Sequence, residues 1–172
     1  LSYQWLKNGT NIAGANEATY KINPATIDKS GNYTVVVYNS SGLVTSNVAK
    51  ITVNAPEIDV QQPVGSSLTS STSKISFGTA RVGKGQISRT FTIKNIGNLN
   101  LNGLAITKAG AHSKEYTTTR LKRRMLSPEA AITFRVTFKA KAVGLRTASI
   151  RIASNDRDEN PFIINLAGEG AR

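Results

Sequence analysis

Alternating apolar and polar positions run through most of the chain and predict β-strands. The clearest example is the segment AITFRVTFKA, in which Phe134 and Phe138 fall on one face and Arg135 falls on the other. A repeat of two residues is typical of a strand, because successive side chains point to opposite faces of a sheet. Similar segments recur about every ten residues, separated by clusters of Gly, Asn, Ser and Pro. The pattern predicts an all-β protein built as a sandwich or a barrel.

One interruption of this pattern indicates a domain boundary. The strand-like segment KITV is followed by the tripeptide Asn-Ala-Pro, after which EIDV begins a new alternating segment. A chain of 172 residues can hold two domains, since ordinary domains contain roughly 100–150 residues. We therefore predict two tandem domains, at residues 1–55 and residues 56–172.

Composition narrows the chemistry that the chain can perform. Cysteine is absent and histidine occurs once, as His112, so disulfides, thiolate metal sites and sites built from several histidines are excluded. No Gly-rich phosphate-binding loop and no acid–base pair can be recognised. We therefore predict that the chain is not an enzyme and has no cofactor, and we expect His112 to be an exposed polar residue. No apolar run approaches the roughly 20 residues that cross a bilayer, so membrane insertion of this segment is not expected.

The first domain resembles the C-terminal part of an immunoglobulin-like (Ig-like) domain of the I-set-like kind that recurs in tandem in bacterial surface proteins. The resemblance covers residues 2–53 and is carried by Trp5, the corner SGNYTV and the hairpin YNSSGLVTSN. It implies that Trp5 is the core tryptophan and that the hydroxyl of Tyr33 bonds back to the backbone. Val35 stands where bridged members carry a cysteine, so valine packing is expected to replace the disulfide. It also implies that the first strands of this domain are missing.

The second domain resembles bacterial choice-of-anchor D modules, which are similar to the hydin-like (ASH-type) Ig-like domains. The resemblance spans residues 56–170. Its markers are FGTARVG (77–83), FTIKNIGNLNL (91–101), SND (154–156) and LAGEG (166–170).

One of these markers predicts a particular turn. In NIGNLNL, Gly97 and Asn98 are predicted to adopt positive φ. Such a turn would let Phe91 and Ile93 face the same core as Leu99 and Leu101. Each marker is explained by the fold and none of them indicates chemistry. The predicted structural core of the two domains consists of Trp5, Tyr33, Val35, Phe91, Phe134, Phe138 and Phe162.

An acidic segment between two predicted strands is a candidate metal site. SNDRDENPF concentrates oxygen-bearing side chains, and oxygen ligands at close spacing suit Ca²⁺. The segment lacks the glycine and the spaced ligands of a known calcium loop, and Asn/Asp-rich turns are common before a strand. An ordinary hairpin turn is therefore the alternative to a calcium site. The candidate calcium ligands are Asn155, Asp156, Asp158 and Glu159.

Positive charge is concentrated in the second domain. The first domain holds four Lys/Arg and two Asp/Glu, a net charge of +2, and the second holds eighteen and eight, a net charge of +10. The segment TTRLKRRML and two arginines on strands that could be neighbours would form a basic face. This face could bind surface polysaccharide or another polyanion, or could simply be solvated. No specific nucleic-acid binding is expected, because aromatic residues that stack on bases are sparse. The candidate anion-binding residues are Arg120, Lys122, Arg123, Arg124, Arg135 and Arg151.

The two resemblances together imply two tandem Ig-like antiparallel β-sandwiches, and they also imply a role. They imply a non-catalytic structural or adhesive stalk segment, a repeat module of a larger bacterial cell-surface or secreted protein. Its expected partners are the neighbouring domains of the same polypeptide, and its expected location is extracellular. The absence of cysteine favours a bacterial surface protein or a cytosolic protein over a eukaryotic secreted sandwich. Three alternatives stay open: a polyanion-binding module, a cytoskeletal or ciliary-type scaffold domain, and an accessory domain of a carbohydrate-active enzyme.

Overall fold

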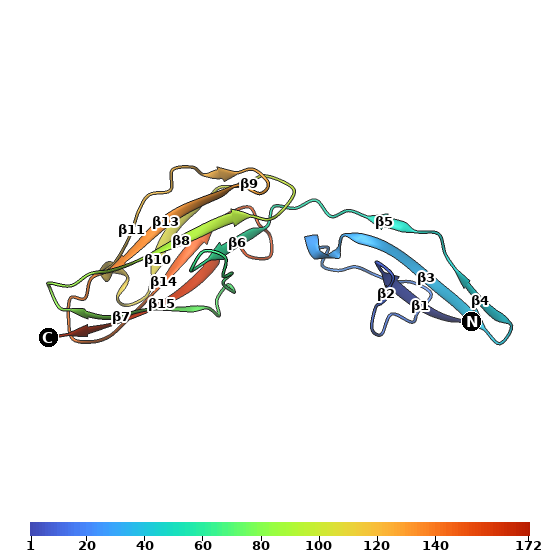
Figure 1. The fold of residues 1–172 in the computed structure, drawn as a ribbon, viewed down its shortest axis with the longest axis horizontal. Coiled ribbons are helices and arrows are strands. Elements are labelled where there is room, and N and C mark those ends of the chain that lie inside the picture. Colours follow the sequence, from blue (N-terminus) through green and yellow to red (C-terminus); the bar gives the residue numbers. More distant parts are fainter. The chain divides into compact units, whose positions relative to one another are not determined.

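The computed structural model describes residues 1–172 and is all-β, as the alternating pattern predicts (Figure 1). The chain divides into two compact units, Leu1–Ala55 and Pro56–Arg172. The second unit is a sandwich, whereas the first unit is a single sheet and not the second sandwich that was expected. Helical structure is limited to two 3₁₀ turns of three residues, η1 (Ile27–Lys29) and η2 (Ser113–Glu115). No helix has the length and the apolar character needed to cross a membrane.

The first unit consists of one five-stranded antiparallel sheet. Its strands follow the order β2-β1-β3-β4, and β5 pairs with the start of β3. A two-residue turn joins β3 to β4, because Asn39 pairs directly with Gly42. The strands are β1 (Ser2–Lys7), β2 (Thr10–Asn11), β3 (Gly31–Asn39), β4 (Gly42–Thr45) and β5 (Ala49–Ile51).

A row of three aromatic rings lies at the centre of the first unit. Trp5 on β1 lies opposite Val35 on β3, and both are half-buried. The ring of Tyr20 lies 6.0 Å from that of Trp5 and 6.0 Å from that of Tyr33, measured between centroids. Tyr33 is 4% exposed, and its hydroxyl donates a 2.7 Å hydrogen bond to the carbonyl of Lys29. Tyr20 is thus a neighbour of the tryptophan that the sequence pattern did not indicate.

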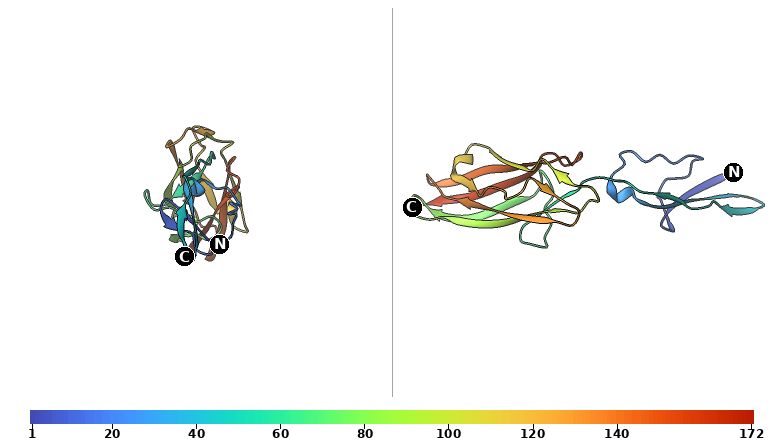
Figure 2. Two further views of the ribbon diagram at one scale, coloured as in Figure 1. Left: turned by 90° about the vertical axis from the view of Figure 1, so that its right-hand side faces the viewer. Right: turned by 90° about the horizontal axis from the view of Figure 1, so that it is seen from above.

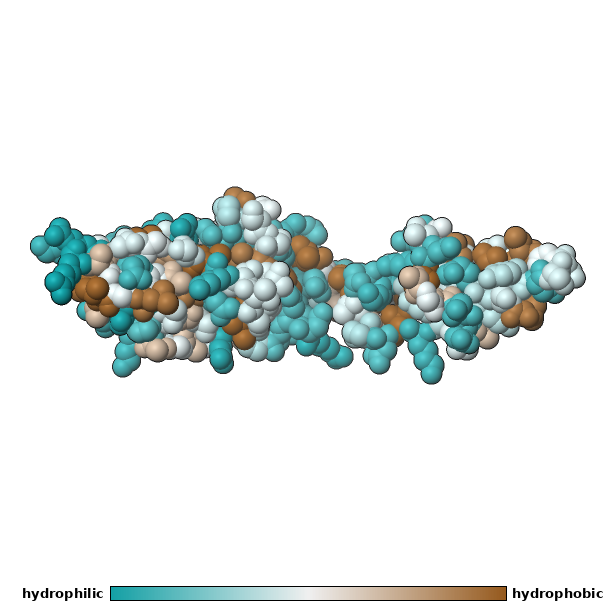
Figure 3. Space-filling model, turned by 90° about the horizontal axis from the view of Figure 1, so that it is seen from below, coloured by the Kyte–Doolittle hydropathy of each residue, from teal (hydrophilic) through white to brown (hydrophobic).

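Many apolar side chains of the first unit are exposed, because a single sheet buries them only in part. Ala15 and Tyr33 are its only buried hydrophobic residues. The hairpin of β3 and β4 carries Tyr38, Leu43 and Val44, whose exposed fractions are 45%, 69% and 71%. Apolar residues are visible on the surface of this unit at the right of Figure 3. Its core is therefore small for a domain that must fold by itself.

The second unit is a sandwich of two four-stranded sheets. One sheet has the order β10-β14-β15-β7, in which β7 is parallel to β15, and the other has the antiparallel order β11-β13-β8-β6. Two short strands, β9 and β12, pair separately. The strands are β6 (Ile58–Gln61), β7 (Lys74–Arg81), β8 (Ile87–Asn95), β9 (Leu101–Asn102), β10 (Ala105–Ala109), β11 (Tyr116–Thr118), β12 (Met125–Leu126), β13 (Ala131–Phe138), β14 (Gly144–Ala153) and β15 (Phe162–Ala171).

The core of the second unit lies between its two sheets. The rings of Phe91 and Phe134 stack with their centroids 5.3 Å apart, and Phe138 stacks on Tyr116 at 4.9 Å. Phe162 comes from the opposite sheet, on β15. The four phenylalanines expected in the core are at most 2% exposed. Alternate side chains of a strand point to the same face of its sheet, and here that face is the one that meets the opposite sheet.

The glycines at the end of β15 allow close packing of the closing strand. A Cβ atom at Gly168 would lie 2.4 Å from the ring of Phe138, and one at Gly170 would lie 2.0 Å from the carbonyl oxygen of Ala142. Both distances are shorter than any van der Waals contact, so only glycine fits without a shift of the neighbours. The LAGEG marker therefore reflects packing.

The predicted left-handed turn at Gly97 and Asn98 is wrong. Neither residue has a positive φ. Leu99 is 46% exposed and does not face the core with Phe91, whereas Leu101 is fully buried in that core, as expected. The sequence pattern assigned the turn to the backbone freedom of Gly97 and Asn98, whereas a buried side chain two positions before Gly97 shapes it.

That side chain is Asn95, which is fully buried at the end of β8. Its Oδ1 accepts hydrogen bonds from the N–H groups of Gly97 (3.0 Å) and Glu57 (3.4 Å). Its Nδ2 donates to the carbonyls of Leu99 (2.8 Å) and Leu126 (3.0 Å). One side chain that pairs with four backbone groups can shape a turn without left-handed backbone.

The chain enters and leaves the second unit at opposite ends of its strands (Figures 1 and 2). Ile58 at the start of β6 pairs with Asn95 at the end of β8. Ala171 at the end of β15 pairs with Arg81 at the end of β7, and a short turn joins β7 to the start of β8. Entry and exit therefore lie beside opposite ends of β8, and the sandwich connects them along its length.

Candidate functional site

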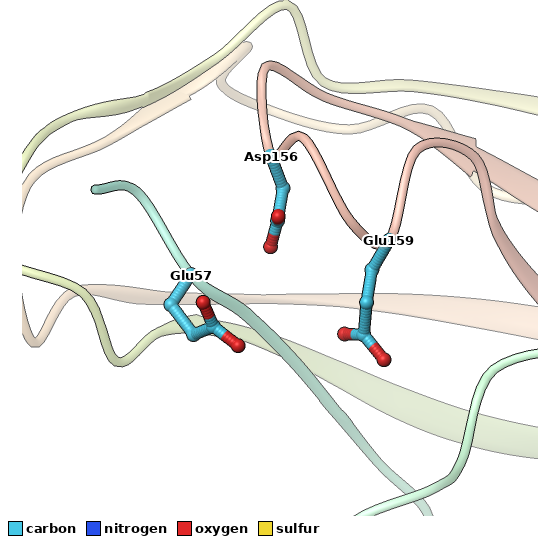
Figure 4. Close-up of side chains that lie close together, drawn as sticks. All are labelled: Glu57, Asp156 and Glu159. Atoms are coloured by element: carbon cyan, nitrogen blue, oxygen red, sulfur yellow. The ribbon is translucent and has the colours of Figure 1, made fainter. Parts of the chain in front are cut away.

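Three carboxylates from distant parts of the sequence meet where the chain enters the second unit (Figure 4). Glu57 immediately precedes β6, and Asp156 and Glu159 lie in the loop between β14 and β15. Carboxylate oxygens of the three residues lie within 4.8 Å of one another. We call these three residues the acidic cluster.

Asp156 ties this loop to the first strand of the unit. It is 1% exposed, and its Oδ2 accepts a 2.8 Å hydrogen bond from the N–H of Ile58. Its Oδ1 accepts a 3.3 Å hydrogen bond from the N–H of Asp158. Burial raises the pKa of Asp156 above its ordinary value, and burial together with the charge of Asp156 raises the pKa of Glu159. Both carboxylates are therefore harder to ionise in the folded unit than in water.

The structure brings together only part of the predicted calcium set. Asp156 and Glu159 are neighbours, but the side chain of Asn155 bonds to the backbone of β9, and Asp158 is exposed outside the cluster. Glu57 was missed because it is far from the loop in sequence. The segment forms the connection between two antiparallel strands, which is the alternative considered above. Three carboxylates are fewer than the six to eight oxygen ligands of Ca²⁺, so a calcium role stays a prediction.

The substitution Glu159→Gln is expected to stabilise the second unit at neutral pH. Carboxylates whose pKa is raised by folding favour the folded state below their ordinary pKa, and this contribution is lost as the pH rises through the raised values. Removing one charge should raise the free energy of unfolding at pH 7 by less than about 1 kcal/mol, since solvent screens part of the repulsion. The gain should vanish below about pH 4, measured by urea denaturation across pH.

The matched control is Glu169→Gln, which removes the same charge from an exposed position on β15. The control should not change how stability depends on pH between 4 and 7. A lower stability of the Glu159→Gln variant at pH 7 would contradict repulsion within the acidic cluster.

Four of the predicted anion-binding residues lie in one loop between β11 and β12, residues 119–124, here called the basic loop. Its start is fixed by two hydrogen bonds between Thr119 and the backbone of Arg135, of 3.0 and 2.9 Å. Its end is fixed by a 3.1 Å hydrogen bond from the N–H of Leu104 to the carbonyl of Arg124. The four cationic residues of the loop are exposed. The loop therefore presents positive charge from an anchored backbone.

The six predicted anion-binding residues do not form one face, which corrects the sequence hypothesis. Arg135 on β13 and Arg151 on β14 were considered for neighbouring strands, but these strands belong to different sheets. Arg135 pairs with Thr90 on β8, and Arg151 pairs with Thr107 on β10. Both arginines are exposed between buried neighbours, so they point outward from opposite sheets. Only the cations of the basic loop stay together.

A buried ion pair that sequence reasoning missed lies beside η2. The guanidinium of Arg146 on β14 donates hydrogen bonds of 2.5–3.1 Å to both carboxylate oxygens of Glu115, which is 5% exposed. The N–H of Lys141 donates to the same carboxylate at 3.1 Å. The bonds from Arg146 hold the pKa of Glu115 below its ordinary value. The stability this carboxylate contributes is therefore present at neutral pH and lost as the pH falls through the lowered pKa.

His112 is half-buried and not the exposed residue that was expected. Its Nδ1 accepts a 2.8 Å hydrogen bond from the N–H of Thr147 on β14. The hydroxyl of Tyr116 donates a 2.8 Å hydrogen bond to the carbonyl of Arg146, and burial raises the pKa of Tyr116 to about 12. The polar groups around η2 therefore attach this segment to the backbone of β14.

The chain belongs to the family of HYDIN/CFA65/VesB-like Ig-like domains. The family model matches residues 66–169, more than half of the chain and entirely within the second unit. This match and the two-sheet fold confirm an Ig-like domain of the hydin type. A comparison with curated proteins found no match.

Solved structures resemble the chain at low sequence identity. A protein of unknown function from Porphyromonas gingivalis W83 has a TM-score of 0.51 at 14% identity, covering 82% of this chain and 64% of that one. The ASH/PapD-like domain 7 of human CEP192 has a TM-score of 0.47 at 12% identity, covering 74% of this chain and 95% of that one. The secreted serine protease VesC from Vibrio cholerae has a TM-score of 0.45 at 13% identity, covering 81% and 32%. The chain thus spans less than two thirds of the Porphyromonas protein, and this likeness concerns the fold alone.

Proposed function

We propose that the chain is a non-catalytic structural segment of a larger bacterial extracellular protein, in which it spaces neighbouring domains. The observation that carries this proposal is the position of the two ends of the second unit. The chain enters beside the end of β8 and leaves beside the end of β7, at opposite ends of the sandwich (Figure 2). A domain with this geometry adds its own length between the domains before and after it.

The use of the buried polar groups supports the same proposal. The side chains of Asn95, Glu115 and Asp156 all bond to backbone groups of the second unit, and Glu115 also bonds to a guanidinium. A catalytic acid, base or nucleophile must instead reach a substrate in a pocket. The extracellular bacterial setting rests on the resemblance of the first unit to the tandem domains of bacterial surface proteins.

A domain exchange in the full-length protein tests the proposal. One variant replaces residues 56–172 by an unrelated β-sandwich with its ends at opposite poles, a second uses a sandwich with adjacent ends, and a third deletes the segment. Antibody labelling of intact cells measures surface display of the outermost domain.

A spacing role predicts that the first replacement keeps display at the level of the native protein, while the deletion and the sandwich with adjacent ends reduce it. If the first replacement loses display as completely as the deletion, the segment has a task that depends on its own sequence. Failure of antibodies against this segment to label intact cells would contradict the extracellular setting.

A further inference from the structure

We propose that the basic loop closes a binding pocket for an acidic sugar unit, carboxylated or sulfated, of a polysaccharide. This binding role goes beyond the spacing role and does not depend on it. The pocket has a volume of about 300 Å³. Its lining includes Ile106 of β10, Thr118 of β11, and Thr119, Arg120 and Arg124 of the basic loop.

The pocket lies between the free edges of the two sheets. β10 is the edge strand of one sheet and β11 is the edge strand of the other. The basic loop leaves β11 and is held at its start by Thr119 and at its end by the bond between Leu104 and Arg124. Leu121, between these points, is half-buried and packs against the core of the sandwich. The two arginines that line the pocket therefore stand on a backbone fixed before any ligand arrives, which favours binding.

None of the ion pairs of the protein involves a side chain of the basic loop. The nearest acidic residues in sequence are engaged elsewhere: Glu115 with Arg146, and Glu129 with Lys94 at 2.6 Å. No guanidinium or ammonium group of the basic loop forms an ion pair or a hydrogen bond. A guanidinium binds carboxylate and sulfate oxygens through two parallel hydrogen bonds, so arginines at both ends of the loop suit one anionic group.

The rest of the lining suits a sugar ring. The hydroxyls of Thr118 and Thr119 can exchange hydrogen bonds with sugar hydroxyls, and the half-buried side chains of Ile106 and Leu121 offer apolar surface to the C–H face of the ring. A second hollow of about 430 Å³ is lined by residues 120–124 and shares both arginines with the first. Two adjoining hollows fit successive units of a chain, so a polysaccharide is favoured over a single sugar.

The arrangement fits nucleic acid poorly. A protein that follows a phosphate backbone needs cations along an extended groove, with aromatic rings on which bases stack. Here the cations are confined to one loop, and Arg135 and Arg151 point outward from opposite sheets. The nearest aromatic residue in sequence, Tyr116, is completely buried and cannot stack on a base.

The test compares two double variants of the 172-residue chain that carry the same net charge. Arg120→Ser with Arg124→Ser removes the two pocket arginines, and Arg135→Ser with Arg151→Ser removes two exposed arginines outside the pocket. Binding of a heparin-derived tetrasaccharide, as the sulfated probe, and of trigalacturonate, as the carboxylated probe, is measured by titration calorimetry at about 0.15 M salt, where long-range attraction is screened. Thermal unfolding verifies that both variants are folded.

Binding of either probe by the native chain is expected, with an affinity that falls at least about tenfold in the pocket variant and less than about threefold in the matched variant. An equal loss in both variants would reduce the interaction to general charge attraction and overturn the proposal. Absence of binding by the native chain would also overturn it. Tighter binding of single-stranded DNA or of anionic vesicles than of both sugars would assign the loop to a different ligand class and overturn it as well.

Discussion

Replacing Phe134 by alanine is expected to lower the free energy of unfolding of the second unit by about 3–5 kcal/mol. Phe134 is 2% exposed and its ring stacks on that of Phe91 at 5.3 Å, so the truncated side chain would leave a cavity between the two sheets. The loss combines the transfer free energy of the ring with the cost of that cavity, because the surrounding strands relax only in part. Urea denaturation followed by circular dichroism measures the change.

The matched control is Leu145→Ala, which truncates a side chain that is 59% exposed on β14 of the same unit. It should change the free energy of unfolding by less than about 0.5 kcal/mol. Fluorescence of Trp5, the only tryptophan, follows the first unit separately. Equal effects of Phe134→Ala and Leu145→Ala would show that the layer between the sheets is not the core of this unit.

The substitution Asn95→Ala is expected to destabilise the second unit by about 3 kcal/mol, an unusually large effect for a polar residue. Four backbone groups lose their hydrogen-bond partner, and each one that stays buried without a partner costs roughly 1–3 kcal/mol. The side chain is completely buried, so water reaches these groups only if the turn opens. The same denaturation measurement determines the loss.

Two further variants separate the hydrogen bonds of Asn95 from the volume of its side chain. Asn95→Asp keeps the size and the accepting oxygen but places a carboxylate opposite the carbonyls of Leu99 and Leu126, so it should be at least as destabilising at pH 7 and less so at acidic pH. Asn100→Ala removes an exposed side chain nearby and should have little effect. If Asn95→Asp is as stable as the native chain at pH 7, the donor bonds do not hold the turn.

The strands and their buried faces were predictable because their signal is local. The alternation of Phe134 and Phe138 with Arg135 assigns an inner and an outer face without any knowledge of the neighbouring strands. The connection between β14 and β15 was predictable for the same reason, since Asn, Asp and Pro interrupt two alternating segments. The predicted conformation of the turn after β8 was wrong, because glycine and asparagine were interpreted as sources of positive φ. The hydrogen-bond partners of Asn95 decide the shape of this turn instead.

The candidate sites were predictable only where their residues are adjacent in sequence. The four cations of the basic loop lie together because they fall within six consecutive residues. The pocket behind the loop was not predictable, since it also needs the edge of β10, which the topology brings beside β11. The prediction of one basic face that includes Arg135 and Arg151 was wrong, because the consecutive strands β13 and β14 belong to different sheets.

The sequence by itself determined that this protein is all-β, where most strands of the second unit run and which of their side chains face inward. A repeat of two residues is a property of each strand alone, so no knowledge of the other strands is required. The tertiary structure alone decided that Glu57 meets Asp156, that Glu115 pairs with Arg146 and that Asn95 reaches Leu126. These contacts depend on the order in which strands join the two sheets, and that order follows from packing of the whole unit and not from any local pattern.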